Sequence, residues 1–299
     1  MGRWPALLFL AGHLACLSAC GGAVTVTSSS DAGSTPDTSS AILDGPAETT
    51  LVGAGSVYVS TDDWSSGPLT VSGAEFTAAT TAASDAGLTT YQSGPCTVLV
   101  FPATATAAAD AGLDPGNTSA GAITITGGAF PLTLTPAAGG TYSHDDESAA
   151  LWTGGGQSFT FTAQGSTAPA FSRSLVAPAS ATLVAPTVVG GPGLDRLTVS
   201  RTQDLSFSWT GGTVGNVIFT LISVTPEDVY ASCTFPVGSG AGTMPASLLS
   251  HFPADPDADF FMDVTSEATI VQDGWSIDLR VMRSVEQSGV YVTGFASIE

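Results

Sequence analysis

The chain has 299 residues and is strongly acidic: 26 aspartate and glutamate residues face six basic ones, for a formal net charge of -20. All six basic residues are arginines, and the absence of lysine excludes Schiff-base catalysis and a phosphate-loop lysine. A chain this acidic is repelled by phosphate backbones, so we expect no nucleic-acid partner. The hydrophobic fraction of 43% predicts that most of the chain packs into a core.

The N-terminus has the features of an export signal. Residues 1–19 combine an arginine near the start with an apolar stretch that is too short for a transmembrane helix. This segment ends in Leu17-Ser18-Ala19-Cys20, which resembles the bacterial lipobox. The resemblance implies a lipoprotein signal peptide, a lipid on Cys20 and attachment to a membrane. Because the next residue is Gly21 and not aspartate, it also favours the outer membrane or cell surface over the inner membrane.

Residues 20–48 are rich in Ser, Thr, Gly, Ala and Asp, and this composition predicts a flexible tether. Short runs of alternating apolar and hydroxyl side chains follow, separated by Gly and Pro, and they predict strands. Residues 49–168 carry one set of strands and are expected to form an N-terminal β-rich domain. Residues 169–299 carry about eight more and are expected to form a C-terminal two-sheet sandwich.

The predicted fold class is therefore all-β, with antiparallel β-sandwich domains after a disordered tether. In the C-terminal part, the pattern LVAP…LTVSRTQDLSFSWTGG…NVIFTLIS resembles immunoglobulin-like and fibronectin type III-like modules of exported bacterial proteins. The resemblance implies an immunoglobulin-like sandwich and no activity. In the run around Trp209, Leu205 and Phe207 share its face, so Trp209 is predicted to be a core residue. The chain also resembles uncharacterised surface lipoproteins of high-G+C gliding bacteria.

One acidic segment is suggestive of a cation site. Four carboxylates stand at relative positions 1, 3, 5 and 9, a spacing similar to that of calcium loops: Asp255, Asp257, Asp259 and Asp263. Phe260 occupies the glycine position of such a loop, and Ser266 stands where the bidentate glutamate belongs. Calcium is the single cofactor hypothesis, and the alternative is an exposed acidic turn that leads into a strand.

Three further features bear on function. Cys96 and Cys233 remain after lipidation, and in an oxidising compartment they either form a disulfide or stay as two buried thiols. Trp64 lies in a polar stretch and either stacks on a ligand such as a sugar or packs in the core. His144 opens an acidic His-Asp-Asp-Glu run, which is expected to be a solvated turn and not a metal site.

These features favour a non-catalytic envelope or surface protein with a structural, adhesive or interaction role. The first alternative is a lipoprotein that binds carbohydrate or another ligand, and the partners considered are carbohydrate and envelope proteins. The second is a hydrolase with an unrecognised carboxylate site, because such pairs are defined by their separation in space and leave no sequence motif. No catalytic residue is assigned.

Overall fold

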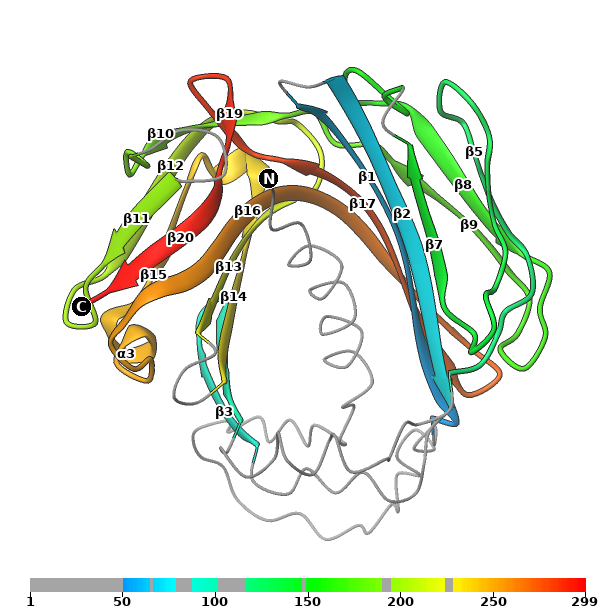
Figure 1. Ribbon diagram of the computed structural model, residues 1–299, viewed down its shortest axis with the longest axis horizontal. Helices are drawn as coiled ribbons and strands as arrows, with labels where there is room; N and C mark the ends of the chain where they lie inside the picture. Colours follow the sequence, from blue (N-terminus) through cyan, green and yellow to red (C-terminus); the bar gives the residue numbers. More distant parts are fainter. Residues whose placement is uncertain are drawn as a thin grey trace, which may run out of the picture.

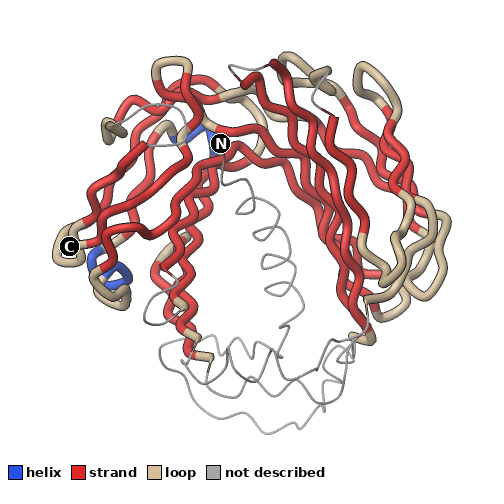
Figure 2. Tube along the Cα trace, viewed as in Figure 1, coloured by secondary structure: helices blue, strands red, loops and turns tan. Residues whose placement is uncertain are grey.

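In a computed structural model of the protein, residues 51–64, 67–78, 88–101, 117–146, 149–189, 195–223 and 228–299 are described. The expected signal peptide, the tether and Cys20 lie outside these ranges. The described strands form three sheets, of eleven, five and four strands. The large sheet bends like an arch, and the two small sheets lie on its outer side, one over each limb (Figure 1, Figure 2).

The first limb is a sandwich of the large sheet and the four-stranded sheet. Four strands of the large sheet contribute to it, in the order β17 (Trp275–Ser284), β1 (Gly53–Trp64), β2 (Gly67–Ala78) and β7 (Tyr142–Asp146). The sheet that faces them has the order β6 (Leu132–Leu134), β5 (Ile123–Thr126), β8 (Ser158–Ala163) and β9 (Phe171–Val176). Side chains from both sheets make one hydrophobic core, which includes Phe76, Phe159, Phe161 and Trp275.

The second limb is a sandwich of the rest of the large sheet and the five-stranded sheet. Its part of the large sheet contains β3 (Thr89–Ser93), β4 (Cys96–Val100), β14 (Val229–Pro236), β13 (Asn216–Ser223), β16 (Asp255–Gln272), β20 (Thr293–Ile298) and β11 (Asp195–Val199). The facing sheet has the order β15 (Ala241–Met244), β12 (Leu205–Gly211), β10 (Ala181–Ala185), β18 (Glu286–Gln287) and β19 (Val290–Tyr291). The 3-10 turn η1 (Val237–Ser239) and the short helix α3 (Ala246–Leu249) complete this limb.

Strand β16 joins the two limbs. Its first half pairs with β13 on one edge and with β20 on the other, and its second half pairs with β17. β17 and β20 therefore lie along the same edge of β16, and the β18–β19 hairpin leaves the sheet between them. The interruption is closed by backbone hydrogen bonds: Val285 N–H donates to Met262 O, and Met262 N–H donates to Val292 O. Figure 1 shows β16 curving over the top of the arch.

Local sequence explains these elements. Residues of β17 alternate between buried and half-buried along the whole strand, which is the period of two that an amphipathic strand requires. The β16–β17 hairpin closes through Asp273 (φ 50°) and Gly274 (φ 76°), with Gln272 paired to Trp275. Two consecutive positive φ values define a two-residue turn of the type that favours Asp-Gly. Ser288 and Gly289 close the β18–β19 hairpin in the same way.

The strand order of the second limb is that of an immunoglobulin-like sandwich. In chain order, β10, β12 and β15 lie in one sheet, whereas β13, β16 and β20 lie in the other. The prediction of an all-β protein built from sandwiches is confirmed. Most strand pairs are antiparallel, but β1 pairs with β17 in parallel, and so does β11 with β20.

Each limb takes strands from both ends of the sequence. β17 belongs to residues 169–299, yet its buried side chains Ile277, Leu279 and Val281 pack in the core of the first limb. β4 belongs to residues 49–168, yet Val98 packs in the core of the second limb. The two limbs are therefore held together by strand pairing across the arch.

Candidate functional sites

The two cysteines of the described chain form a disulfide. Cys96 on β4 stands directly opposite Cys233 on β14, and both residues are fully buried. Their sulfurs are bonded at 2.07 Å, across a sequence separation of 137 residues. The bond ties the N-terminal strand pair β3–β4 to the core of the second limb.

The four aspartates of the expected calcium loop do not surround a common point. Residues 255–272 form one strand with a bulge between Asp255 and Ala258, and in its regular part residues on the same face lie about 6.6 Å apart. Oxygens around one Ca²⁺ lie within about 5 Å of each other, since each is about 2.4 Å from the ion. Within the described ranges, no three His, Cys, Asp or Glu side chains are grouped so that they could hold a metal ion. The loop that the calcium hypothesis requires is not formed.

Each of these carboxylates has surroundings of its own. Asp255 is buried and accepts hydrogen bonds from the Ser223 hydroxyl at 2.6 Å and from the Asp257 N–H at 2.9 Å. Asp257 is exposed and forms an ion pair with Arg196 at 3.2 Å. Burial, together with the charge of Asp255, raises the pKa of Asp259. Asp263 lies further along the strand, at the junction of the two limbs.

Two tryptophans and two histidines of the sequence lie in different surroundings. Trp64 is the last residue of β1, and its side chain lies outside the described part of the structure. Trp209 is buried, and its indole N–H donates to Val237 O at 2.8 Å, which confirms the prediction of a core residue. His144 belongs to strand β7 and not to a turn. His251 stacks on the ring of Tyr91, with a centroid separation of 3.5 Å.

The first candidate site is a carboxyl cluster on the inner face of the arch, formed by Asp62, Asp263 and Ser284. The inner face is the side of the large sheet that turns away from both hydrophobic cores. Val59 of β1, Val281 of β17 and Val264 of β16 point into the cores, so the alternate residues of these strands point to the inner face. The three members of the cluster come from β1, β16 and β17, strands that are up to 222 residues apart in the chain.

Ser284 stands at the centre of the carboxyl cluster. Its backbone N–H donates to one oxygen of Asp62 at 3.0 Å, and its hydroxyl oxygen lies 3.4 Å from the other. The same hydroxyl oxygen lies 3.1 Å from a carboxyl oxygen of Asp263. The register of β1 with β17 ends at Ser60, so the Asp62 side chain continues the contact to β17 after the backbone pairing stops.

Asp263 is the electrostatically unusual member of the carboxyl cluster. Burial and the nearby charge of Asp62 raise its pKa to about 7, and the hydrogen bond from Ser284 opposes this rise. An acid that is half-protonated near neutral pH beside a second carboxylate is an arrangement able to store or transfer a proton. In the sequence, Asp263 stands out only as a candidate calcium ligand, and nothing in the local sequence of Asp62 or Ser284 shows that they meet it.

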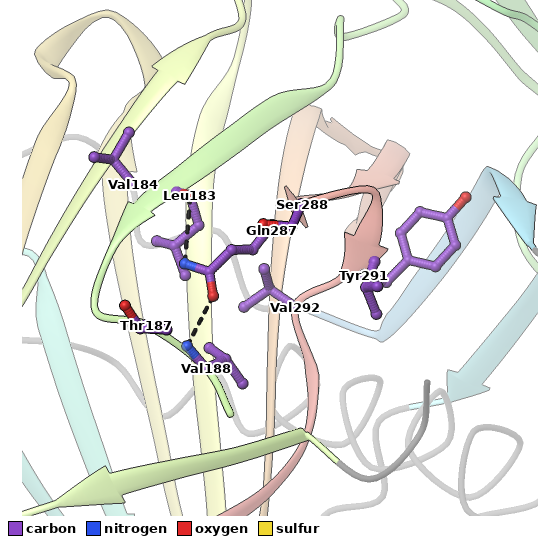
Figure 3. Close-up of a pocket in the computed structure, with 9 residues that line it drawn as sticks. Leu183, Val184, Thr187, Val188, Gln287, Ser288, Tyr291 and Val292 are labelled. Atoms are coloured by element: carbon purple, nitrogen blue, oxygen red, sulfur yellow. Dashed lines mark hydrogen bonds between the residues drawn. The ribbon is translucent and has the colours of Figure 1, made fainter. Parts of the chain in front are cut away.

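The second candidate site is a pocket of about 300 Å³ beneath the β18–β19 hairpin (Figure 3). Five of its nine lining residues are aliphatic. The Gln287 amide spans its floor: it accepts from Val188 N–H at 2.7 Å, donates to Pro186 O at 2.9 Å and lies 3.4 Å from Leu183 O. The lining residues are Leu183, Val184, Thr187, Val188, Gln287, Ser288, Val290, Tyr291 and Val292.

The pocket offers both apolar side chains and polar groups, and most of its exposed lining is polar. The Gln287 side chain is engaged by the loop after β10, which contains the cis Ala185–Pro186 peptide bond. Val184 presents an apolar side chain that is 57% exposed at the rim. In the described ranges, no helix has the length and apolar composition needed to cross a membrane.

Comparisons with known proteins assign no family to the chain. No protein-family model matches the chain, and no curated protein matches it. Among solved structures, the chain is similar to the fibronectin(III)-like modules of CbhA from Clostridium thermocellum. The identity is 12%, the match covers 68% of this chain and 95% of that chain, and the TM-score is 0.17. A TM-score of this size carries no argument, so the fold assignment rests on the strand order.

Proposed function

We propose that this is an exported, lipid-anchored envelope or surface protein with a structural or interaction role. The buried Cys96–Cys233 disulfide is the observation that supports export of the protein from the cytoplasm. Structural disulfides persist in oxidising compartments outside the cytoplasm and are rare inside it. The Leu17-Ser18-Ala19-Cys20 motif supports a lipid on Cys20, and Gly21 supports an outer-membrane or surface destination.

The architecture supports a structural or interaction role. Two sandwiches that share one sheet form a stiff body, because bending it would break the pairing of β16 with β13, β20 and β17. Immunoglobulin-like sandwiches serve widely as frames that present loops and edges to partners. Joined to a membrane by residues 20–48, such a body would hold its surface away from the lipid.

The lipid anchor is tested by the Cys20→Ala variant. It should lose palmitate labelling and should no longer partition into the detergent phase, because the acceptor sulfur is gone. Cys16→Ala is the matched control: it removes a cysteine of the expected leader and should leave labelling unchanged. Full labelling of the Cys20→Ala protein would contradict the anchor.

A further inference from the structure

Strand β3 lies at one end of the eleven-stranded sheet and leaves an open edge there (Figure 1). It pairs with β4 over all five of its residues, from Thr89 to Ser93, without a bulge. Among the described strands it has no second partner, so the backbone groups along its other side have no strand to pair with. A regular open edge of this kind is a template for another strand.

The other edge strands of the described sheets have features that discourage pairing. Charged side chains stand on β7 (Asp145), on β9 (Arg173) and on β11 (Arg196), and the open side of β11 is also bridged by Val189. β6, β15 and β19 have three, four and two residues. Natural sheets use charged side chains and short edge strands to prevent pairing at their edges. β3 has neither protection.

The β3–β4 hairpin is uncharged, although the chain has a formal net charge of -20. Residues 88–101 contain no Asp, Glu, Lys, Arg or His. A basic partner therefore finds no carboxylate to bind along this hairpin. Two copies of so acidic a chain repel each other, and the repulsion is weakest where the facing segments carry no charge. The edge is thus better suited to a second copy of the chain than to a basic partner.

We propose that two copies of this protein pair through β3, antiparallel and about a two-fold axis at Tyr91, so that their two large sheets join into one. Full overlap of the two strands places Tyr91 opposite Tyr91 of the second copy. It places Thr90 opposite Gln92 of the second copy, and this contact occurs twice. No charges meet in this register, and aromatic pairs and pairs that can hydrogen-bond stabilise antiparallel strands.

The side chains of β3 are placed for these contacts. Tyr91 stands opposite Val98, which is buried in the core of the second limb, so Tyr91 lies on the core side of the sheet. Its ring stacks on His251, with a centroid separation of 3.5 Å. Thr90 and Gln92 lie on the inner face, and both are exposed. Because the stack and the disulfide of β4 already hold the hairpin in place, little ordering is needed when a second strand pairs with it.

The inference rests on the interaction part of the proposed function and not on the lipid anchor. A pair of five-residue strands is a small contact, so the pairing is expected to be reversible. A disulfide between the two copies would trap it.

The test uses the full-length protein with single cysteine substitutions, produced together in the same cells and oxidised there. In the proposed register, Thr90→Cys of one copy faces Gln92→Cys of the other. Two identical thiols are instead diagonal neighbours about 7 to 8 Å apart, too far for an unstrained bridge. Cells that produce both variants should therefore yield several-fold more covalent dimer than cells that produce either variant alone.

Two controls set the background. The wild-type protein keeps Cys16 and Cys20 and shows any cross-link through these residues. Ser143→Cys, exposed on the edge strand β7, is the matched control and should give no more dimer than wild type. With purified variants, raising the salt from about 0.1 M to about 1 M shortens the Debye length from about 10 Å to about 3 Å. The repulsion between copies then falls, and the yield of mixed dimer should rise.

Three outcomes would overturn the proposal. The first is a mixed-dimer yield no higher than the wild-type background, even where palmitate labelling confirms the lipid on Cys20. The second is equal cross-linking of mixed and single variants, because a defined register forbids it. The third is a cross-link of either thiol to a different protein in place of the mixed dimer, which would assign the β3 edge to another partner.

Discussion

At the scale of single residues, two tryptophans pack in the cores where two sheets face each other. Trp209 packs near Phe235, with ring centroids 6.0 Å apart, and Trp152 packs against Phe159 at 5.2 Å. Each indole also finds a backbone acceptor: Trp209 donates to Val237 O, and Trp152 donates to Pro178 O. These residues thus combine apolar burial with a satisfied polar group.

Truncation of Trp209 should therefore destabilise the protein strongly. Trp209→Ala removes a side chain from a core position that is 3% exposed, and it removes one of the two donors to the Val237 carbonyl, the other being Gly240 N–H. A buried aromatic truncated to alanine typically costs about 3 to 5 kcal/mol of unfolding free energy. Urea unfolding followed by circular dichroism measures the loss.

The control for this prediction is the neighbouring residue on the opposite face. Ser208 is half-buried, and Ser208→Ala should change the unfolding free energy by less than about 0.5 kcal/mol. If Trp209→Ala unfolds at the same urea concentration as wild type, the indole does not contribute to the core as described.

At the scale of elements, the β18–β19 hairpin is the clearest departure from a regular sandwich. It leaves the edge of β16 between β17 and β20 and crosses to the opposite sheet, where Glu286 pairs with Thr182 of β10. Its contact with the loop after β10 depends on the side chain of Gln287. The hairpin thereby links the two sheets of the second limb at one edge.

Gln287→Ala should release this loop without unfolding the sandwich. The change removes the acceptor of Val188 N–H and the donor to Pro186 O, and each lost bond costs on the order of 1 kcal/mol. Hydrogen exchange should speed up at Val188 and stay slow at Phe219, which lies in the centre of β13.

Ser288→Ala is the matched control, since this hairpin residue lies next to Gln287 and, among the residues that the structure describes, its side chain makes no hydrogen bond to the loop. Equal exchange rates at Val188 in wild type and in Gln287→Ala would show that the loop is held by other contacts.

At the scale of the whole molecule, cross-connections hold the two limbs together. β16 spans both limbs, and β1 pairs in parallel with β17 from the far end of the chain. The Cys96–Cys233 disulfide adds a covalent link between strands of the first and last thirds of the sequence. Because each core contains strands from both ends, we expect the limbs to unfold together and not one after the other.

Loss of the disulfide should lower the stability of the whole arch. The bond closes a loop of more than 100 residues, for which chain entropy predicts about 4 to 5 kcal/mol, and measured losses in small domains are about 2 to 5 kcal/mol. Cys96→Ala with Cys233→Ala should therefore unfold at a clearly lower urea concentration, in a single transition.

Mass spectrometry checks the bond itself. Without reduction, the peptides that contain Cys96 and Cys233 should be found linked. Free alkylation of both thiols in the native protein would contradict the link, and two separate unfolding transitions would contradict the cooperativity of the limbs.

Much of the local structure follows from the sequence alone. The alternation in Leu205, Phe207 and Trp209 predicts a strand with a buried face, and the Asp273-Gly274 pair suits the tight turn between β16 and β17. The acidic segment from Asp255 to Asp263 is a case in which the sequence pattern is ambiguous. Relative positions 1, 3, 5 and 9 are all odd, so this spacing fits one face of a strand as well as a calcium loop. The sequence does not show the bulge between Asp255 and Ala258, after which Asp255 is buried while Asp257 is exposed.

Only the tertiary structure decides which strands pair and which polar groups meet. Alternation with a period of two indicates that a strand has a buried face. It does not identify the partner strand, because any amphipathic strand can pair with any open sheet edge of suitable length. The parallel pairing of β1 with β17, and the division of β16 between two sandwiches, depend on the packing of the whole chain. Asp62, Asp263 and Ser284 meet for this reason.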